Sequence, residues 1–353
     1  MLDYIIVGSG IAGIAFCETA SKFNKKFIVF NDESQNSSKV AAGLYNPVIL
    51  KRFSQVWHAS EQLDILENFY TNLEYKLKCK LDYKISIQRK LFSIEEQNNW
   101  FVAADMPNLI EFLSSKLITK KKQFITSKFG FGEVLRTGYI DTRVLISEYT
   151  NLLKLKNIYV NETFDYSNLF ISNNFIEYKN IKARHIIFAE GFGNRYNPFF
   201  NYLPVDGTKG ELLIVKATDL DLKEIINSSI YLIPIGENLY KVGATYNWED
   251  KTNFVTESGK SEIIKNLKNL ISCDFDVVEH RAGVRPTVKD RRPLIGTHPK
   301  HNRLHILNGL GTRGVMIAPE LAPILYNYIE NNIPLDDYIN INRFSKLHSS
   351  NLD

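Results

Sequence analysis

The chain opens with an apolar strand that runs into a glycine turn and a helix, and this opening constrains the fold more than any other stretch. Residues 3–8 read DYIIVG, residues 8–13 read GSGIAG, and residues 11–23 have the apolar spacing of a helix. Residues 25–32, KKFIVFND, then read as a second strand. Strand, glycine turn, helix and strand in this order are typical of the unit that binds a dinucleotide at the edge of a parallel sheet. The opening therefore predicts an α/β domain with a nucleotide site.

Each glycine of the turn has a physical role in such a site. Gly8 permits the tight turn, Gly10 lets the backbone approach a pyrophosphate, and Gly13 lets the helix pack closely on the strand. The free N–H groups at the helix start then receive the phosphates. An acidic residue that holds the ribose is expected about 20 residues further on. Asn31 stands at that place and Asp32 follows it, and either side chain can hydrogen-bond a ribose. The alternative is a glycine turn in an α/β domain without a nucleotide.

A second match to the same glycine pattern lies near the end of the chain. Residues 309–314 read GLGTRG, between an expected strand that ends LHILNG and an expected helix over 315–330. No further parallel strand can be placed after that helix, so the match does not predict a second nucleotide unit. Its backbone N–H groups could instead face a carbonyl that gains negative charge. Arg313 stands where the helix dipole disfavours a cation, which an adjacent anion would explain. The alternatives are a solvated arginine and a simple tight turn.

The middle of the chain is richer in strands. Residues 83–93, 128–140, 158–164, 175–191 and 211–248 read mostly as strands, with helices near 108–117, over 142–157 and near 258–271. We predict an α/β fold, α+β overall, in which a Rossmann-like domain is interleaved with a mostly antiparallel β substrate domain. The predicted ranges are 1–81, 138–203 and 281–345 for the first domain, and 82–137 and 204–280 for the second.

Composition narrows the classes of function. A net charge of +4 suits an anionic ligand but does not indicate nucleic-acid binding. The three cysteines are far apart, which argues against disulfides and fits the cytoplasm. The sequence has no run of eighteen consecutive apolar residues, so it predicts no membrane span. His298, His301 and His305 span a turn rather than one helix face, so we expect no metal site. The Lys120–Lys122 run predicts a solvated turn, with tRNA phosphate contact as the alternative.

Seven stretches, taken together, resemble a known family. Six of them are GSGIAG, SSKVAAGLYNP, AEGFGN, KGELLIV, YLIPIGENLYKVGATY and AGVRPTVKDRRPLIG, and the seventh is NGLGTRGVMIAPELA. They come in the order seen in FAD-dependent oxidoreductases of the D-amino acid oxidase superfamily, which includes glycine and sarcosine oxidases. GLGTRG with the following Ala-Pro also resembles the oxidoreductase half of the bifunctional enzyme that makes 5-methylaminomethyl-2-thiouridine in tRNA. Leu310 and Thr312 stand where glycine oxidases tend to have a histidine and an arginine.

The resemblance implies one FAD and assigns residues to it. The expected cofactor contacts are made, from the pyrophosphate to the flavin, by Gly8, Ser9, Gly10, Ile11, Ala12, Gly13, Asn31 or Asp32, Thr163 or Phe164, Ala189, Glu190, Gly191, Ala41, Ala42, Gly43, Gly283, Arg285, Gly311, Thr312, Arg313, Gly314 and Val315.

The resemblance further implies oxidation of a carbon–nitrogen single bond, with hydride passing to flavin N5 and water hydrolysing the imine. Arg285 is the expected carboxylate ligand, since its planar fork can bind both oxygens; a structural ion pair, for instance with Asp290, is the alternative. Tyr231 and Tyr246 are the expected pocket tyrosines, or else core or edge aromatics. Lys209 is expected near the flavin, or else at the surface.

We therefore predict an amine or amino-acid oxidoreductase with a small-molecule substrate. Three rivals remain: an enzyme that removes a carboxymethyl group from a tRNA wobble-uridine side chain, an NAD-dependent dehydrogenase, and a flavin-binding protein without turnover.

Overall fold

A largely parallel sheet drawn from both ends and the middle of the chain forms one part of the molecule. The computed structural model describes residues 1–120 and 122–350. The N-terminal strand β1 (Leu2–Val7) lies at the centre of this sheet, between β2 (Phe27–Asn31) and β14 (Ile181–Phe188), and pairs in parallel with both. Strand β11 (Tyr159–Asn161) extends it beyond β2, and β21 (His301–Asn308) extends it beyond β14. The strand order β11-β2-β1-β14-β21 is that of a doubly wound sheet.

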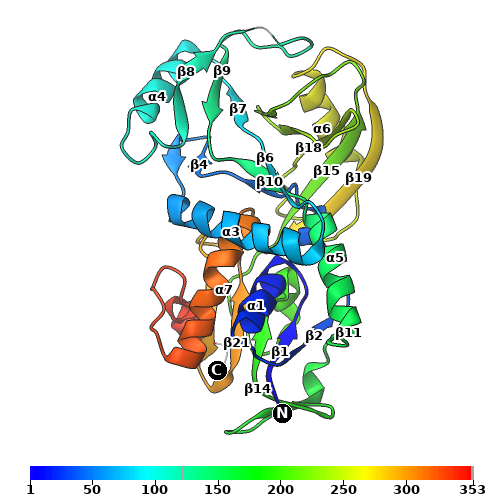
Figure 1. Ribbon diagram of the computed structural model, residues 1–353, viewed down its shortest axis with the longest axis vertical. Coiled ribbons are helices and arrows are strands. Elements are labelled where there is room, and N and C mark those ends of the chain that lie inside the picture. Colours follow the sequence, from blue (N-terminus) through cyan, green and yellow to red (C-terminus); the bar gives the residue numbers. More distant parts are fainter. Residues whose placement is uncertain (121, 351–353) are drawn as a thin grey trace.

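Antiparallel strands and helices complete this part. The antiparallel strands at its edges are β12 (Leu169–Ile171), β13 (Ile176–Tyr178) and β20 (Leu294–His298). Helix α1 (Ile11–Lys22) packs against α7 (Gly314–Asn331), and α5 (Thr142–Leu155) lies beside them. Figure 1 shows α1 and α7, from opposite ends of the sequence, side by side over this sheet. Their buried residues join the sheet in one large apolar core.

A second, eight-stranded sheet forms the other part of the molecule. Its strands, in spatial order, are β19 (Asp276–Arg285), β15 (Thr208–Lys216), β18 (Leu239–Gly243), β17 (Tyr231–Pro234), β16 (Ile225–Asn227), β7 (Ile87–Lys90), β9 (Phe131–Val134) and β8 (Leu113–Ile118). All neighbours pair antiparallel except β16 and β7. Helices α4 (Ile94–Ala104) and α6 (Glu257–Lys268) pack against it, and α3 (Ala59–Leu77) crosses between the two parts (Figure 1).

The remaining elements are short. They are α2 (Ser37–Val40), β3 (Leu44–Tyr45), β4 (Val48–Ile49), β5 (Ser54–Gln55), β6 (Asp82–Lys84), β10 (Gly138–Ile140), the 3₁₀ turns η1 (Tyr166–Asn168), η2 (Gly191–Tyr196) and η3 (Ile341–Phe344), and α8 (Ser345–Ser350). Strands β3, β10 and β6 form a small sheet between the large ones. Strand β3, which follows Ala41–Gly43, is held in this small sheet by its pairing with β10, and β10 pairs in turn with β6.

The predicted α/β class is confirmed, and most predicted elements are present. The expected helix near 108–117 is wrong, because Leu113–Ile118 forms β8 and pairs with β9. Helices α3 and α4 were not predicted. No strand follows α7 among the described residues. The division into two domains stays a prediction; β19 crosses one proposed boundary, at residues 280/281. Within the described chain, no helix is long and apolar enough to span a membrane.

Candidate cofactor and substrate site

One large cavity lies where the two sheets meet. It encloses about 1360 Å³, more than the roughly 300–1,000 Å³ of an ordinary ligand pocket. Both glycine turns border it: residues Gly8 and Gly10–Ala12 from the first, and Leu310–Val315 from the second. Every predicted site residue lies on its wall except Ser9, Gly13 and Lys209. Two turns separated by most of the chain therefore face the same space.

The first glycine turn is shaped by close backbone contacts. Gly8 has a φ of +103°, and a Cβ there would lie 2.4 Å from the carbonyl oxygen of Ala189. A Cβ at Gly13 would lie 2.0 Å from the carbonyl oxygen of Gly8. Only glycine fits either position. Helix α1 starts here with no acidic residue in its first turn, so its positive end faces the cavity without a carboxylate of its own helix.

Asn31 holds the turn from the next strand. Its Oδ1 accepts a hydrogen bond from the Ser9 backbone N–H at 3.1 Å, and its Nδ2 donates to the Tyr159 hydroxyl at 3.2 Å. The Ser9 N–H is thus already used, which explains why Ser9 lies behind the cavity wall rather than on it. Asn31 and Asp32 both border the cavity. Burial would raise the pKa of Asp32, but hydrogen bonds from Ser34 outweigh this effect and lower the pKa. The carboxylate is therefore ionised and can accept hydrogen bonds from hydroxyl groups.

A buried carboxyl group lies at the same end of the cavity. Tyr166 and Asn197 donate hydrogen bonds to the two oxygens of Glu190, the latter at 2.7 Å. Burial raises the pKa of Glu190 from 4.5 to about 7. Thr163 and Phe164 border the cavity beside it. Glu190 follows β14 with only Ala189 between them, so it lies at the carboxyl edge of the parallel sheet, where ligands of such sheets bind.

The second glycine turn presents backbone and a cation to the cavity. Gly311 has a φ of +56°, and no atom lies within 4 Å of where its Cβ would be. Helix α7 begins at Gly314 without an acidic residue in its first turn. Arg313 Nη1 is buried and has no hydrogen-bond partner among the described residues. Burial lowers the pKa of this guanidinium. A fully solvated arginine does not fit these observations, whereas a nearby anion does.

The second sheet supplies the opposite wall, and its pairing decides which side chains reach it. Residues directly opposite on antiparallel strands share a face, and neighbours along a strand alternate. Arg285 pairs with Thr208, Lys241 with Ile214, and Tyr231 with Gly243. Thr208, Gly210, Leu212 and Ile214 are every second residue of β15 and so share one face. The side chains of Arg285, Lys241 and Tyr231 therefore lie on that same face of the sheet. All three border the cavity.

Arg285 is a partly buried cation that has no carboxylate partner among the described residues. Its Nη1 and Nη2 lie 3.4 and 3.5 Å from the carbonyl oxygen of Thr245, and its Cζ lies 4.5 Å from the ring centroid of Tyr246. A Cβ at Gly210 would lie 2.0 Å from Nη2, so that glycine gives the guanidinium its space. Burial lowers the pKa of Arg285. Asp290, the alternative ion-pair partner, pairs instead with Arg343 at 2.8 Å.

Tyr231 and Tyr246 differ in exposure. Burial raises the pKa of Tyr231 to about 12, so its hydroxyl stays protonated and can donate a hydrogen bond. Tyr246 is 59% exposed and lies at the cavity rim. Both therefore reach the cavity, one as a buried donor and one as a rim aromatic.

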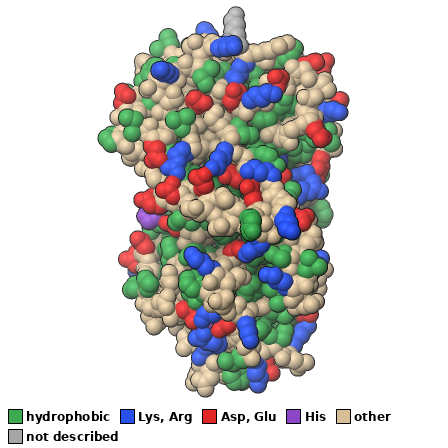
Figure 2. All heavy atoms as spheres, viewed as in Figure 1, with side chains coloured by type: hydrophobic (Ala, Val, Ile, Leu, Met, Phe, Trp, Pro, Cys, Tyr) green, Lys and Arg blue, Asp and Glu red, His purple; other side chains and the backbone are tan. Residues whose placement is uncertain are grey.

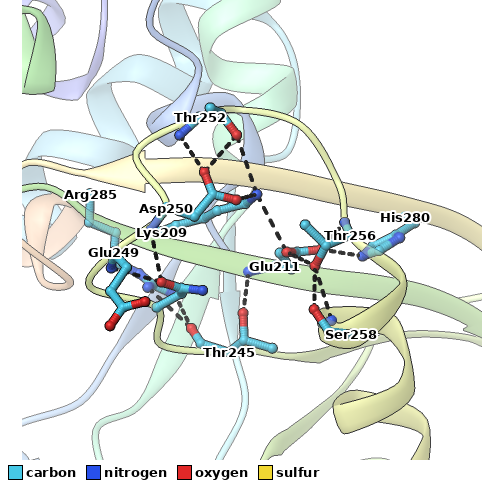
Figure 3. A network of polar contacts seen from close by, with 12 residues as sticks. Lys209, Glu211, Thr245, Glu249, Asp250, Thr252, Thr256, Ser258, His280 and Arg285 are labelled. Atoms are coloured by element: carbon cyan, nitrogen blue, oxygen red, sulfur yellow. Dashed lines mark hydrogen bonds and ion pairs between the residues drawn. The ribbon is translucent and has the colours of Figure 1, made fainter.

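Lys209 requires a correction. It alternates with Thr208 and Gly210, so it lies on the opposite face of β15 and does not border the cavity. Its ammonium is buried and pairs with Asp250 at 2.5 Å (Figure 3). A buried ammonium needs such a partner. The structure thus assigns Lys209 to a polar network behind the sheet, neither beside the cofactor nor at the surface.

Sequence reasoning missed four cations on the cavity wall: Lys51, Arg89, Lys241 and Lys251. Lys241 is 7% exposed, its Nζ lies 4.9 Å from the ring centroid of Tyr139, and burial lowers its pKa. Arg89 pairs with Glu96 at 2.8 Å and donates to Asn227 at 3.0 Å. A lysine between apolar residues in LYKVG was a usable signal. The sequence could not show that both faces of that strand are covered.

Other sequence candidates lie elsewhere. Lys122 donates to Glu224 at 2.8 Å, and Lys121 lies outside the described residues. His305 contacts His185 at 3.0 Å and Thr297 at 2.7 Å. No group of three or more His, Cys, Asp or Glu side chains in the described part of the chain is arranged to hold a metal ion.

The wall of the cavity fits a dinucleotide that carries a flavin. The N-termini of α1 and α7, which have no acidic residue in their first turns, face the cavity. The glycines there have no side chain to cover the backbone N–H groups. The match to family models decides the family: the model described as FAD dependent oxidoreductase covers residues 3–327.

The chain belongs to this family of FAD-dependent oxidoreductases. It is 27% identical over 171 residues to the glycine oxidase of Bacillus subtilis, covering 46% of each chain. It is 28% identical over 131 residues to the bifunctional protein of tRNA 5-methylaminomethyl-2-thiouridine biosynthesis from Idiomarina loihiensis, covering 35% of this chain and 21% of that one. These two alignments span less than half of each relative's length.

A solved structure shows the same fold over nearly the whole chain. The iminodiacetate oxidase of Chelativorans sp. BNC1 superposes with a TM-score of 0.77 at 16% identity, covering 95% of this chain and 98% of that one. At this identity the likeness establishes the fold. The family membership identifies the protein as an oxidoreductase with FAD as its cofactor.

Proposed function

We propose that this oxidoreductase oxidises the carbon–nitrogen bond of an amino acid or an N-substituted glycine, and that Arg285 binds the substrate carboxylate. The observation that carries the proposal is the Arg285 guanidinium, which borders the cavity and has no acidic partner among the described residues. A partly buried cation of this kind favours an anionic ligand, and a carboxylate matches its planar fork.

Other residues complete the proposed pocket. FAD, when bound, supplies the acceptor for the hydride that leaves the carbon beside the amine. The Tyr231 hydroxyl, which stays protonated, can donate a hydrogen bond to the substrate. The Tyr246 ring covers Arg285 from the rim and limits its contact with water. The protein therefore contributes orientation and charge rather than a general base.

The same proposal assigns the cofactor contacts. The start of α1 would receive the pyrophosphate, and Asn31 or Asp32 the ribose. The turn Gly311–Val315, with the positive end of α7 and Arg313, would face the flavin edge that gains negative charge. Glycine oxidase among the relatives supports a small amino-acid substrate.

A second candidate is the side chain of a tRNA wobble uridine, which is also an N-alkylglycine. Two observations favour it: the alignment with the tRNA-modifying protein, and exposed aromatics at the cavity rim. Tyr196 is 68% exposed and Phe254 78%, and Arg195 stacks 5.1 Å from the Tyr196 ring centroid. Such aromatics can stack on unpaired bases. Figure 2 shows acidic and basic side chains interspersed over the face it draws, so that face offers no broad basic surface.

The test is an anaerobic absorbance assay of the purified holoenzyme. Glycine, sarcosine, iminodiacetate, proline, D-amino acids and hypomodified tRNA are offered in turn, and loss of the oxidised flavin spectrum is followed. Bleaching by small amino acids supports the main proposal. Bleaching by the tRNA alone supports the second candidate. A protein that binds flavin but is reduced by none of them is a flavin-binding protein without amine turnover, and both proposals then fail.

A further inference from the structure

The segment that follows β18 supplies a large share of the cavity rim. We call residues 245–256 the strap; it runs from the end of β18 to the start of α6. Five of its residues border the cavity: Tyr246, Lys251, Thr252, Asn253 and Phe254. Asn253 also donates to the carbonyl oxygen of Ser34 at 3.1 Å, next to the proposed ribose site. The strap thus connects the substrate wall with the cofactor wall.

Backbone hydrogen bonds fasten the strap to β15. Lys209 and Asn247 exchange both of theirs, at 2.9 and 3.0 Å, and the Thr245 N–H donates to the Glu211 carbonyl at 3.1 Å. The Thr245 hydroxyl accepts from the Glu211 N–H at 2.9 Å. The first three strap residues are therefore registered on one edge of β15. Beyond them the strap leaves the sheet.

The Lys209 and Glu211 side chains, on the face of β15 that points away from the cavity, hold the rest of the strap (Figure 3). Lys209 reaches Asp250, and Asp250 in turn accepts from the Thr252 N–H at 2.8 Å and the Thr252 hydroxyl at 2.7 Å. Glu211 accepts from the Thr256 N–H at 2.9 Å and the Thr256 hydroxyl at 2.7 Å. Hydrogen bonds from a charged group are about twice as strong as neutral ones. These anchors hold the strap at its middle and at its end.

Arg285 depends on the beginning of the strap. Its two protein contacts described above are the Thr245 carbonyl and the Tyr246 ring, which are consecutive strap residues. Both hydrogen bonds are long, at 3.4 and 3.5 Å, so they orient the guanidinium weakly on their own. The orientation of Arg285 is thereby coupled to where the strap lies.

We infer that Lys209, acting through Asp250, is a positioning residue that holds the strap so that Arg285 presents its fork to a carboxylate. This inference rests on the proposed function, because it assigns Arg285 a carboxylate ligand. Lys209 touches neither cofactor nor substrate; it acts from the opposite face of β15. Because the two hydrogen bonds to Arg285 are already 3.4 and 3.5 Å long, a small shift of the strap is sufficient to weaken how the guanidinium binds a carboxylate.

The decisive variant is Asp250→Asn, which removes the charge but keeps the shape. Lys209 keeps Glu211 as a counter-ion at 3.6 Å, so the buried ammonium is not left unpaired. The matched control is Asp221→Asn, which breaks the exposed pair between Lys223 and Asp221 in the same part of the fold. Lys209→Met is the second variant and removes the cation itself.

Two readouts are taken from each holoenzyme. The first is the dissociation constant of glycolate, a carboxylate without an amine, measured by perturbation of the flavin spectrum. The second is amide hydrogen exchange of the strap peptide. We expect Asp250→Asn and Lys209→Met to weaken glycolate binding about tenfold, which is about 1.4 kcal/mol, and to speed exchange in the strap. The substrate KM rises by a similar factor, while kcat at saturation changes less than about twofold. Asp221→Asn changes neither readout.

Several outcomes would overturn the inference. They are unchanged glycolate affinity in Asp250→Asn, faster exchange across the whole chain instead of in the strap, and a fall in kcat without a change in KM. Absence of glycolate binding by the wild-type protein also overturns it. A wild-type protein that binds glycolate but is reduced by no amine refutes the proposed function, while the strap comparison still decides this inference.

Discussion

The guanidinium carbon of Arg285 lies 4.5 Å from the ring centroid of Tyr246, and no carboxylate of the described chain pairs with it. The arginine is held between an aromatic ring and the carbonyl of Thr245 on a wall of the cavity. A cation in this setting is desolvated without a protein counter-ion. A substrate carboxylate would supply one.

Replacing Arg285 with lysine should therefore impair substrates that carry a carboxylate. Lysine keeps the charge but loses the fork that binds both oxygens. We expect kcat/KM for the preferred amino acid to fall roughly 10²-fold, since a lost hydrogen bond to a charged group costs about 1.5–3 kcal/mol. The reduction rate with the methyl ester of the same amino acid should change little. Arg303→Lys, whose guanidinium binds the carbonyls of Asn173 and Arg184, is the control and should behave as the wild type.

Gly311→Ala should separate cofactor contact from folding. The Cβ would enter open space, so the apoprotein pays only for the positive φ, about 1–2 kcal/mol. With FAD bound, the methyl group would meet the flavin, and we expect the FAD dissociation constant to rise at least tenfold. Gly236 has a φ of +91° and equally open space but does not border the cavity. Gly236→Ala should lose similar stability and keep its FAD affinity; equal FAD affinity in both variants would contradict the assignment.

Glu190 predicts a pH dependence of stability. Burial raises its pKa from 4.5 in an exposed carboxyl group to about 7 in the folded protein. The folded state then holds the proton more tightly than the unfolded chain, so this contribution to stability is present below pH 4.5 and is lost as the pH rises to about 7. Glu190→Gln removes the titration. We expect the variant to gain stability relative to wild type at pH 8 but not at pH 4, measured by urea unfolding of the apoprotein.

Local pattern was sufficient for the opening of the fold. The apolar run of β1, the glycines and the spacing of α1 each agree with the observed unit, and β2 follows as predicted. Two missed helices also carried signals. In α3 the buried residues Leu63, Leu66, Tyr70 and Leu73 follow helical spacing, and Ser93 accepts a hydrogen bond from the Glu96 N–H at the start of α4.

Other features depended on pairing that no local pattern contains. Leu113–Ile118 has few apolar positions and suits a helix as well as a strand; its pairing with β9 decides. The same holds for the site. KGELLIV did not indicate which of its alternate side chains faces the cavity, and Lys209 proved to face away. The register with β19, in which Thr208 pairs with Arg285 and Lys209 with Val284, fixes that choice.

The measurement that tests the central claim most directly compares one substrate with and without its carboxylate. The holoenzyme is mixed anaerobically with sarcosine, and in parallel with dimethylamine, which has the same amine but no carboxylate, and the rate of flavin bleaching is recorded. Glycine with methylamine, and iminodiacetate with its diamide, serve as further pairs. The account predicts that at least one acid bleaches the flavin and that its partner without the carboxylate does so at least about 10²-fold more slowly. Equal rates within the pairs, or no bleaching by any acid in a protein that dithionite reduces, would contradict it.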